Sequence, residues 1–164
     1  MFPPSEYEMI ICVGYTHMNS IRQRIFTEAK AKGYHIISFI HESATVLTDE
    51  IGEGTIVMER ALIGPFCKLG IGNIVFADAH IAHHTTIGDF NFFTISVAIA
   101  GNIKIGNNCF FGNNCTIRNG IEIRDYTLVG AGAYVSKSTE AYDVMVPNRA
   151  VKLDGKTSLD IVFR

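Results

Sequence analysis

The chain of 164 residues contains no run of 18 consecutive apolar residues, so it offers no candidate for a membrane-spanning helix. Its first residues, MFPPSEYEM, lack the basic start and the apolar run of a secretory signal peptide. Charge is nearly balanced, with 14 lysines and arginines against 16 aspartates and glutamates. Without a basic excess, nothing points to nucleic acid or an anionic membrane as a partner. We therefore expect neither membrane insertion nor nucleic-acid binding.

The cysteines form no CxxC pair. There are four of them, Cys12, Cys67, Cys109 and Cys115. Unpaired cysteines are the rule in a reducing compartment, so we expect a cytoplasmic protein.

A six-residue repeat dominates the middle of the chain. From Ile51 to Tyr134 the sequence divides without a gap into fourteen hexads: IGEGTI, VMERAL, IGPFCK, LGIGNI, VFADAH, IAHHTT, IGDFNF, FTISVA, IAGNIK, IGNNCF, FGNNCT, IRNGIE, IRDYTL and VGAGAY. The first position is always apolar, the fifth is never aromatic or charged, and the second is glycine in seven hexads. A period of six fits neither an α-helix nor an alternating strand. It predicts a coil with three short, similar sides.

The positions within a hexad predict where side chains lie. The first residue should fill the interior of the coil, and the fifth should lie near a corner where space is short. We expect Cys67, Cys109 and Cys115, all at the fifth position, to be small interior hydrophobes rather than nucleophiles. Asn73 and Asn91 are eighteen residues apart and should satisfy each other or the backbone. Glycine at the second position should relax the backbone for the turn.

This pattern resembles the hexapeptide repeat of the left-handed β-helix acyltransferases. In that family three hexads make one coil, so the chain returns to the same face after eighteen residues. The resemblance implies a mainly β fold, a left-handed parallel β-helix of four to five coils, joined to a small N-terminal α/β unit.

The flanking segments predict that unit and a tail. Residues 8–15 and 35–40 are expected to be strands, and residues 19–34 a helix with Asn19 or Ser20 as its cap and Gly33 at its end. Such a unit is too small to hold a core, so it must pack on the coils or on another chain. We divide the chain into a truncated α/β unit (1–43), a β-helix acyltransferase domain (44–145) and a C-terminal tail (146–164).

One branch of the family matches more closely. The stretches IHESATV, AHHTTIGDF, AGNIKIGNNCFFG, NGIEI and VGAGAYV are similar to bacterial acetyltransferases of nucleotide-linked amino sugars and to the sialic acid O-acetyltransferase group. Full-length relatives open with a glycine-rich nucleotide-binding turn. Here the first strand and helix match the second strand–helix step of that unit, and Gly14 is the only glycine near their turn. No GxGxxG fingerprint is present.

The resemblance also assigns a catalytic site. In this branch a histidine five residues before the glycine of an "IG-acidic-aromatic" stretch is the general base; Gly88 is that glycine, and the base is His83. Gly101 follows His83 by eighteen residues, which sets it one rung away, and the family's glycine here donates its N–H to the acetyl carbonyl oxygen. Relatives often have an acidic residue after the base, and some have a second histidine near the acetyl group. This chain has His84 and Phe92 there.

Two other interpretations of the histidines compete with catalysis. His80, His83 and His84 lie within five positions, as metal ligands can. The related γ-class carbonic anhydrases, however, spread their three zinc ligands over different coils and two subunits, and no histidine follows His84 here. We therefore expect no metal. We interpret His80 as a surface histidine without a function. We interpret His84 in the same way, unless it orients His83.

The family forms trimers with an acetyl-CoA groove between neighbouring coils. The resemblance thus implies a homotrimer and acetyl-CoA as the acyl donor. The expected cofactor-binding residues are Phe92, Gly101, Gly112, Asn113, Gly130, Ala131 and Pro147. Phe76, Phe90 and Phe92 fall at positions that need not face the interior, and an exposed aromatic set would favour an interface.

The predicted function is transfer of an acetyl group from acetyl-CoA to a sugar, above all to the amino group of a nucleotide-linked amino sugar in surface polysaccharide biosynthesis. The thioester is already activated, so a neutral imidazole that takes the attacking group's proton suffices, without a covalent intermediate. Two alternatives stay open: a sugar O-acetyltransferase and a non-catalytic trimeric scaffold. His83 with Gly101 favours an enzyme, whereas Phe92 and the missing glycine-rich turn favour a scaffold.

Overall fold

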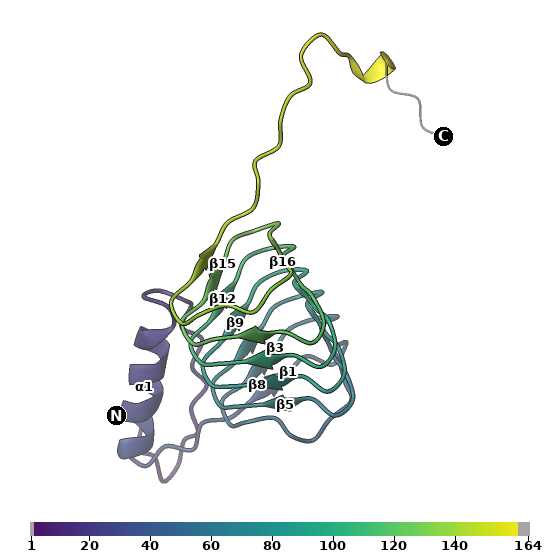
Figure 1. Cartoon of the computed structure of the whole chain (residues 1–164). Coiled ribbons are helices and arrows are strands. Elements are labelled where there is room, and N and C mark those ends of the chain that lie inside the picture. Colours follow the sequence, from purple (N-terminus) through teal and green to yellow (C-terminus); the bar gives the residue numbers. More distant parts are fainter. Residues whose placement is uncertain (1, 161–164) are drawn as a thin grey trace.

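The chain folds as a stack of coils with one helix at its side and an extended tail (Figure 1), as a computed structural model of residues 2–160 shows. Every strand is two residues long, and the strands form three parallel sheets, one on each side of the coil. The predicted mainly β fold, a left-handed parallel β-helix of hexapeptide repeats with a small N-terminal α/β unit, is confirmed.

The three sheets stack their strands along the axis of the coil. The first sheet contains, in spatial order, β1 (Phe39–Ile40), β3 (Ile56–Val57), β6 (Ile74–Val75), β9 (Phe92–Phe93), β12 (Phe110–Phe111), β15 (Leu128–Val129) and β17 (Val144–Met145). The second sheet contains β16 (Tyr134–Val135), β13 (Thr116–Ile117), β10 (Ala98–Ile99), β7 (His80–Ile81), β4 (Leu62–Ile63) and β2 (Thr45–Val46). The third sheet contains β14 (Glu122–Ile123), β11 (Lys104–Ile105), β8 (Thr86–Ile87) and β5 (Lys68–Leu69).

The register confirms the eighteen-residue rung. In the regular part of the stack, strands pair residues eighteen apart, such as Ala98 with Thr116. The offset is seventeen at the lower end, where Phe39 pairs with Ile56, and sixteen at the upper end, where Leu128 pairs with Val144. The hexads predict four to five coils, but the structure has about six turns. The irregular segments before Ile51 and after Tyr134 wind as well.

The second residue of each strand from β3 to β16 fills the coil. Val57, Ile63, Ile81 and Val129 are completely buried there, and such burial stabilises by about 1.5–3 kcal/mol for each side chain. The fifth positions behave as predicted. Cys109 and its fellow interior cysteines are buried, and the N–H of Cys109 donates to Asn91 Oδ1 at 2.8 Å, while the N–H of Asn91 donates to Asn73 Oδ1 at 2.9 Å.

The turn, in contrast, is made at the fourth position of the hexad and not at the second. All fourteen fourth-position residues have a positive φ, between 55° and 72°. The seven second-position glycines have no positive φ, so they serve another purpose. A Cβ at Gly88 would lie 2.7 Å from the carbonyl oxygen of Gly106, one coil away. Glycine is needed there because neighbouring coils approach closely, and the expected relaxation of the backbone is not the reason.

The N-terminal unit packs on the first sheet. Its helix α1 (Ser20–Ala31) runs beside the coils (Figure 1), and Met9 bridges Ile36 in parallel, which leaves a minimal β-α-β connection. Phe26 of α1 packs on Phe90 with ring centroids 5.4 Å apart. Of the two arrangements that the sequence left open, packing on the coils is the one observed.

The expected exposed aromatic set is therefore absent. Tyr15 packs on Phe92 with ring centroids 5.0 Å apart, and Phe76 contacts Phe92 with ring centroids 5.2 Å apart and planes inclined by 34°. Phe90 is 3% exposed and Phe92 is 4% exposed. The prediction that Phe90 and Phe92 belong to an exposed interface was wrong, because the N-terminal unit covers them, while Phe76 is half-buried.

A buried arginine joins that unit to the coils. Arg22 is 2% exposed, and its guanidinium donates to carbonyl oxygens of Gly72 at 3.1 Å and Phe90 at 2.9 Å. Burial lowers the pKa of Arg22 to about 10. Asn19 accepts from Arg22 at 3.0 Å and donates to the carbonyl oxygen of Cys109 at 3.1 Å. Asn19 thus occupies the N-cap of α1 without the expected side-chain cap.

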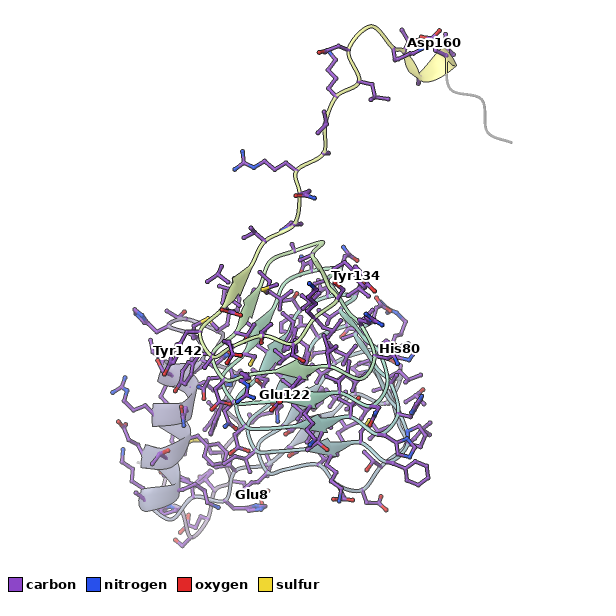
Figure 2. The ribbon with its side chains drawn as sticks, viewed as in Figure 1. Glu8, His80, Glu122, Tyr134, Tyr142 and Asp160 are labelled. Atoms are coloured by element: carbon purple, nitrogen blue, oxygen red, sulfur yellow. The ribbon has the colours of Figure 1, made fainter. Side chains whose placement is uncertain are left out.

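The last described residues leave the stack. Residues 148–160 extend away from the coils, with the short helix η1 (Ser158–Asp160) near their end (Figure 1). The side chain of Asp160 accordingly lies far from the coils (Figure 2). Within residues 2–160, no helix has the length and apolar character that a membrane crossing requires.

Candidate active site

The corner between β7 and β8 presents the predicted base. Ile81 before the corner and Ile87 after it are buried in the core, which fixes the backbone between them. His83 and His84 lie at the corner with exposed side chains. His80 lies on the outer face of the second sheet, and Figure 2 shows it on the same side of the stack as Tyr134.

The His83 ring lies directly against Gly101. A Cβ at Gly101 would be 2.6 Å from His83 Cε1 and 2.7 Å from His83 Nε2. The rung is held by the N–H of Asn102, which donates to the carbonyl oxygen of His83 at 2.9 Å. Among the residues that the structure describes, the N–H of Gly101 has no hydrogen-bond acceptor. A ring nitrogen and an unused amide donor therefore lie next to each other.

The second histidine contacts the first. His83 Nδ1 and His84 Nδ1 are 3.0 Å apart. Two neutral imidazoles can form this hydrogen bond only if one Nδ1 carries the proton and the other accepts it. The His84 ring also stacks on Phe66, with ring centroids 4.7 Å apart and planes inclined by 34°. Sequence reasoning missed Phe66, although it precedes His84 by eighteen residues and the rung rule identifies it.

A polar hollow opens beside His84. It has a volume of about 430 Å³ and lies along the third sheet, lined by His84, Asn102, Lys104, Glu122 and Ser138 among others. Its lining offers both charges and neutral hydrogen-bonding groups, which suits a polar ligand next to the histidine pair.

The predicted cofactor-binding residues form a second group. Gly112, Asn113, Gly130 and Ala131 lie where the chain passes from the first sheet to the second. A Cβ at Gly112 would be 2.5 Å from the Ala131 amide nitrogen, and one at Gly130 would be 3.2 Å from Pro147 Cδ. The structure thus brings these five residues together.

The histidine pair and the Gly112–Ala131 group lie at the two corners of the coil that flank the second sheet. On one coil, Asn113 lies between β12 and β13, whereas Asn119, one coil along from Gly101, lies between β13 and β14. Phe92 lies on the outer face of the first sheet beneath Tyr15, away from His83. Among the described residues of one chain, Gly101 contacts the predicted base, whereas Gly112, Asn113, Gly130 and Ala131 lie at another corner of the coil.

Metal chemistry finds no support in the part of the chain that is described. In residues 2–160, no three histidine, cysteine, aspartate or glutamate side chains are grouped so that they could hold a metal ion. The interior cysteines are also poor nucleophiles, because burial raises the pKa of Cys109 and of Cys115 to about 12.

Comparisons with known proteins point to one kind of enzyme. The family model "Hexapeptide repeat of succinyl-transferase" matches residues 102–137. The acetyltransferase domain of PglB from Neisseria gonorrhoeae, also solved with acetyl coenzyme A, is 27% identical with a TM-score of 0.83, over 92% of this chain and 72% of that one. PerB from Caulobacter crescentus, solved with CoA and GDP-perosamine, shares the fold at 22% identity and a TM-score of 0.72, over 87% of this chain and 68% of that one.

These likenesses confirm the resemblance that the repeat and the motif around Gly88 predict. The chain carries a hexapeptide repeat and is built like the acetyltransferase domain of PglB.

Proposed function

We propose that this chain transfers the acetyl group of acetyl-CoA to the amino group of a nucleotide-linked amino sugar, a reaction that the family resemblance links to surface polysaccharide. The observation that carries the proposal is the His83 ring against the free N–H of Gly101. The PglB domain binds acetyl coenzyme A, and PerB binds CoA with GDP-perosamine, which supports this donor and this class of acceptor.

The chemistry follows from these two groups. The amine nitrogen attacks the thioester carbon while its proton passes to His83 Nε2. The resulting oxyanion accepts a hydrogen bond from the Gly101 N–H, which is already in place. Collapse of the oxyanion breaks the carbon–sulfur bond, and the CoA sulfur leaves with the proton that His83 held. Orientation of both reactants in one cleft supplies much of the remaining rate.

A homotrimer completes the site in this proposal. The corner that carries His83 and the groove residues Gly112 and Ala131 flank the second sheet. A neighbouring copy that packs on this sheet therefore places its own groove residues next to His83 of the first copy. Small outward side chains on that sheet, Ala98 and Thr116, allow such close packing. We place the reaction in the cytoplasm, where acetyl-CoA is made and where free cysteines persist.

One assay tests the proposal. The full chain is incubated with acetyl-CoA and GDP-perosamine, and the CoA formed is measured by chromatography. Release of CoA that depends on the amino sugar supports the proposal. A nucleotide sugar with a hydroxyl in place of the amine serves as the matched acceptor, and a preference for it would identify an O-acetyltransferase. If no acceptor leads to CoA release and millimolar acetyl-CoA does not raise the melting temperature, the proposal fails and the non-catalytic scaffold is the function that remains.

A further inference from the structure

We propose that His84 is a positioning residue whose Nδ1 accepts the Nδ1–H of His83, so that His83 Nε2 is kept free to take a proton. This inference rests on the proposed function and deepens it. Two contacts carry it: the 3.0 Å separation of the two Nδ1 atoms, and the stacking of His84 on Phe66.

The backbone and Phe66 hold His84 in place for this task. His84 has φ 57°, the left-handed conformation of every fourth hexad position, and this directs its side chain out from the corner. The Phe66 ring, one coil away, limits the rotation of the His84 ring. Without this contact, the exposed imidazole would sample several rotamers, and the entropy of that motion would outweigh its hydrogen bond.

The hydrogen bond fixes a tautomer. A neutral imidazole carries one proton, and in water this proton exchanges between its two nitrogens. With His84 Nδ1 as acceptor, the proton of His83 stays on Nδ1 and the lone pair stays on Nε2. When Nε2 then takes the proton of the attacking amine, the Nδ1–H remains bonded to a lone pair and stabilises the imidazolium.

The hydrogen-bond acceptor in this pair, His84 Nδ1, is neutral. This distinguishes the pair from a histidine that is hydrogen-bonded to a carboxylate. A second proton on His84 would set two N–H groups against each other at 3.0 Å, so this hydrogen bond requires a neutral His84. The groups around His84 are His83, the uncharged ring of Phe66, and Lys104 and Glu122 in the hollow. Lys104 and Glu122 carry opposite charges.

The chain itself supplies a matched set of substitutions. Phe66, Asp78 and Asn102 occupy the same hexad position with φ between 57° and 60°. His84→Phe removes the acceptor, His84→Asn keeps a neutral one, and His84→Asp makes it an anion. The Oδ1 of asparagine or aspartate is as many bonds from Cα as the Nδ1 that it replaces. Each variant therefore fits the corner.

Steady-state kinetics with acetyl-CoA and the amino sugar form the first test. We expect His84→Phe to lower kcat by about tenfold or more with little change in the KM for acetyl-CoA. His84→Asn should stay within about threefold of the original kcat, because one neutral hydrogen bond replaces another. His84→Asp should move the acid limb of the rate profile to higher pH by on the order of one unit, since a carboxylate stabilises the His83 imidazolium. His35→Phe, at an exposed histidine of the N-terminal unit, is the control.

The ring tautomer gives a second readout that needs no activity. The ¹⁵N chemical shifts of His83 should show a protonated Nδ1 in the original chain and in His84→Asn, and a tautomer mixture in His84→Phe. An unchanged tautomer together with a normal kcat in His84→Phe would overturn the inference, and so would an Asn variant as impaired as the Phe variant. A chain that fixes the tautomer but releases no CoA would refute the proposed function while leaving the pairing intact.

Discussion

The imidazole of His83 occupies the space that a side chain at Gly101 would fill. The contact joins two residues eighteen positions apart and so depends on the regularity of the coil. It also makes the glycine a requirement of the site and not of the fold.

Substitution of Gly101 by alanine tests that distinction. The three atoms nearest to the new methyl group would all belong to the exposed His83 ring, so the ring must swing aside. We expect kcat to fall by about 10- to 100-fold while the melting temperature changes little. Gly88→Ala is the matched control, because its methyl group would meet the backbone of Gly106 and should lower the melting temperature. Equal loss of melting temperature in both variants would contradict this account.

The buried Arg22 predicts a large effect on stability. Its guanidinium donates to carbonyl oxygens from both the N-terminal unit and the coils, including those of Gly14 and Phe90. Arg22→Met leaves these oxygens without donors, and we expect the free energy of unfolding to fall by on the order of 3 kcal/mol. Urea denaturation measures it. Arg24→Met, on the exposed side of the same helix, should cost less than about 0.5 kcal/mol. If both variants lower the free energy of unfolding by the same small amount, the hydrogen bonds of Arg22 are not needed for stability.

The cysteines predict a pattern of thiol reactivity. Cys12 is exposed, whereas Cys67, Cys109 and Cys115 are buried. Burial raises the pKa of all three interior thiols, to about 12 for Cys109 and Cys115. At pH 8 a thiol reagent should therefore modify one cysteine quickly in the folded chain and all four in denaturant. Fast modification of a second cysteine in the folded chain would mean that the coil interior opens.

The sequence predicts the coil because its pattern is local and repeated. An apolar residue opens each hexad, and only residues such as Ile81 and Val129, inside the coil, are constrained so regularly. The same periodicity places Gly101 beside His83 and Phe66 beside His84. The first of these pairs was predicted, and the second was within reach of the same rule.

What covers the outside of the coil could not be predicted in this way. The sequence predicts Phe92 to be an exposed aromatic residue, because nothing in its hexad indicates that Tyr15 lies over it. Asn19 reads as a helix cap, yet its side chain reaches Cys109, ninety residues away. Such contacts depend on shape at long range. Phe92, predicted near the acetyl group, lies on a different face from His83, so its role in the site stays a prediction.

Removal of the predicted base tests the central claim most directly. We expect His83→Ala to lower kcat for acetyl transfer to the amino sugar by about 100-fold or more, with little change in the KM for acetyl-CoA, because His83 takes the proton of the acceptor. The original chain should lose activity at acid pH, because a protonated His83 cannot take the proton of the attacking amine, and this acid limb should be missing in the variant. His83→Ala with a normal kcat and an intact acid limb would contradict the account and would assign the base to another residue.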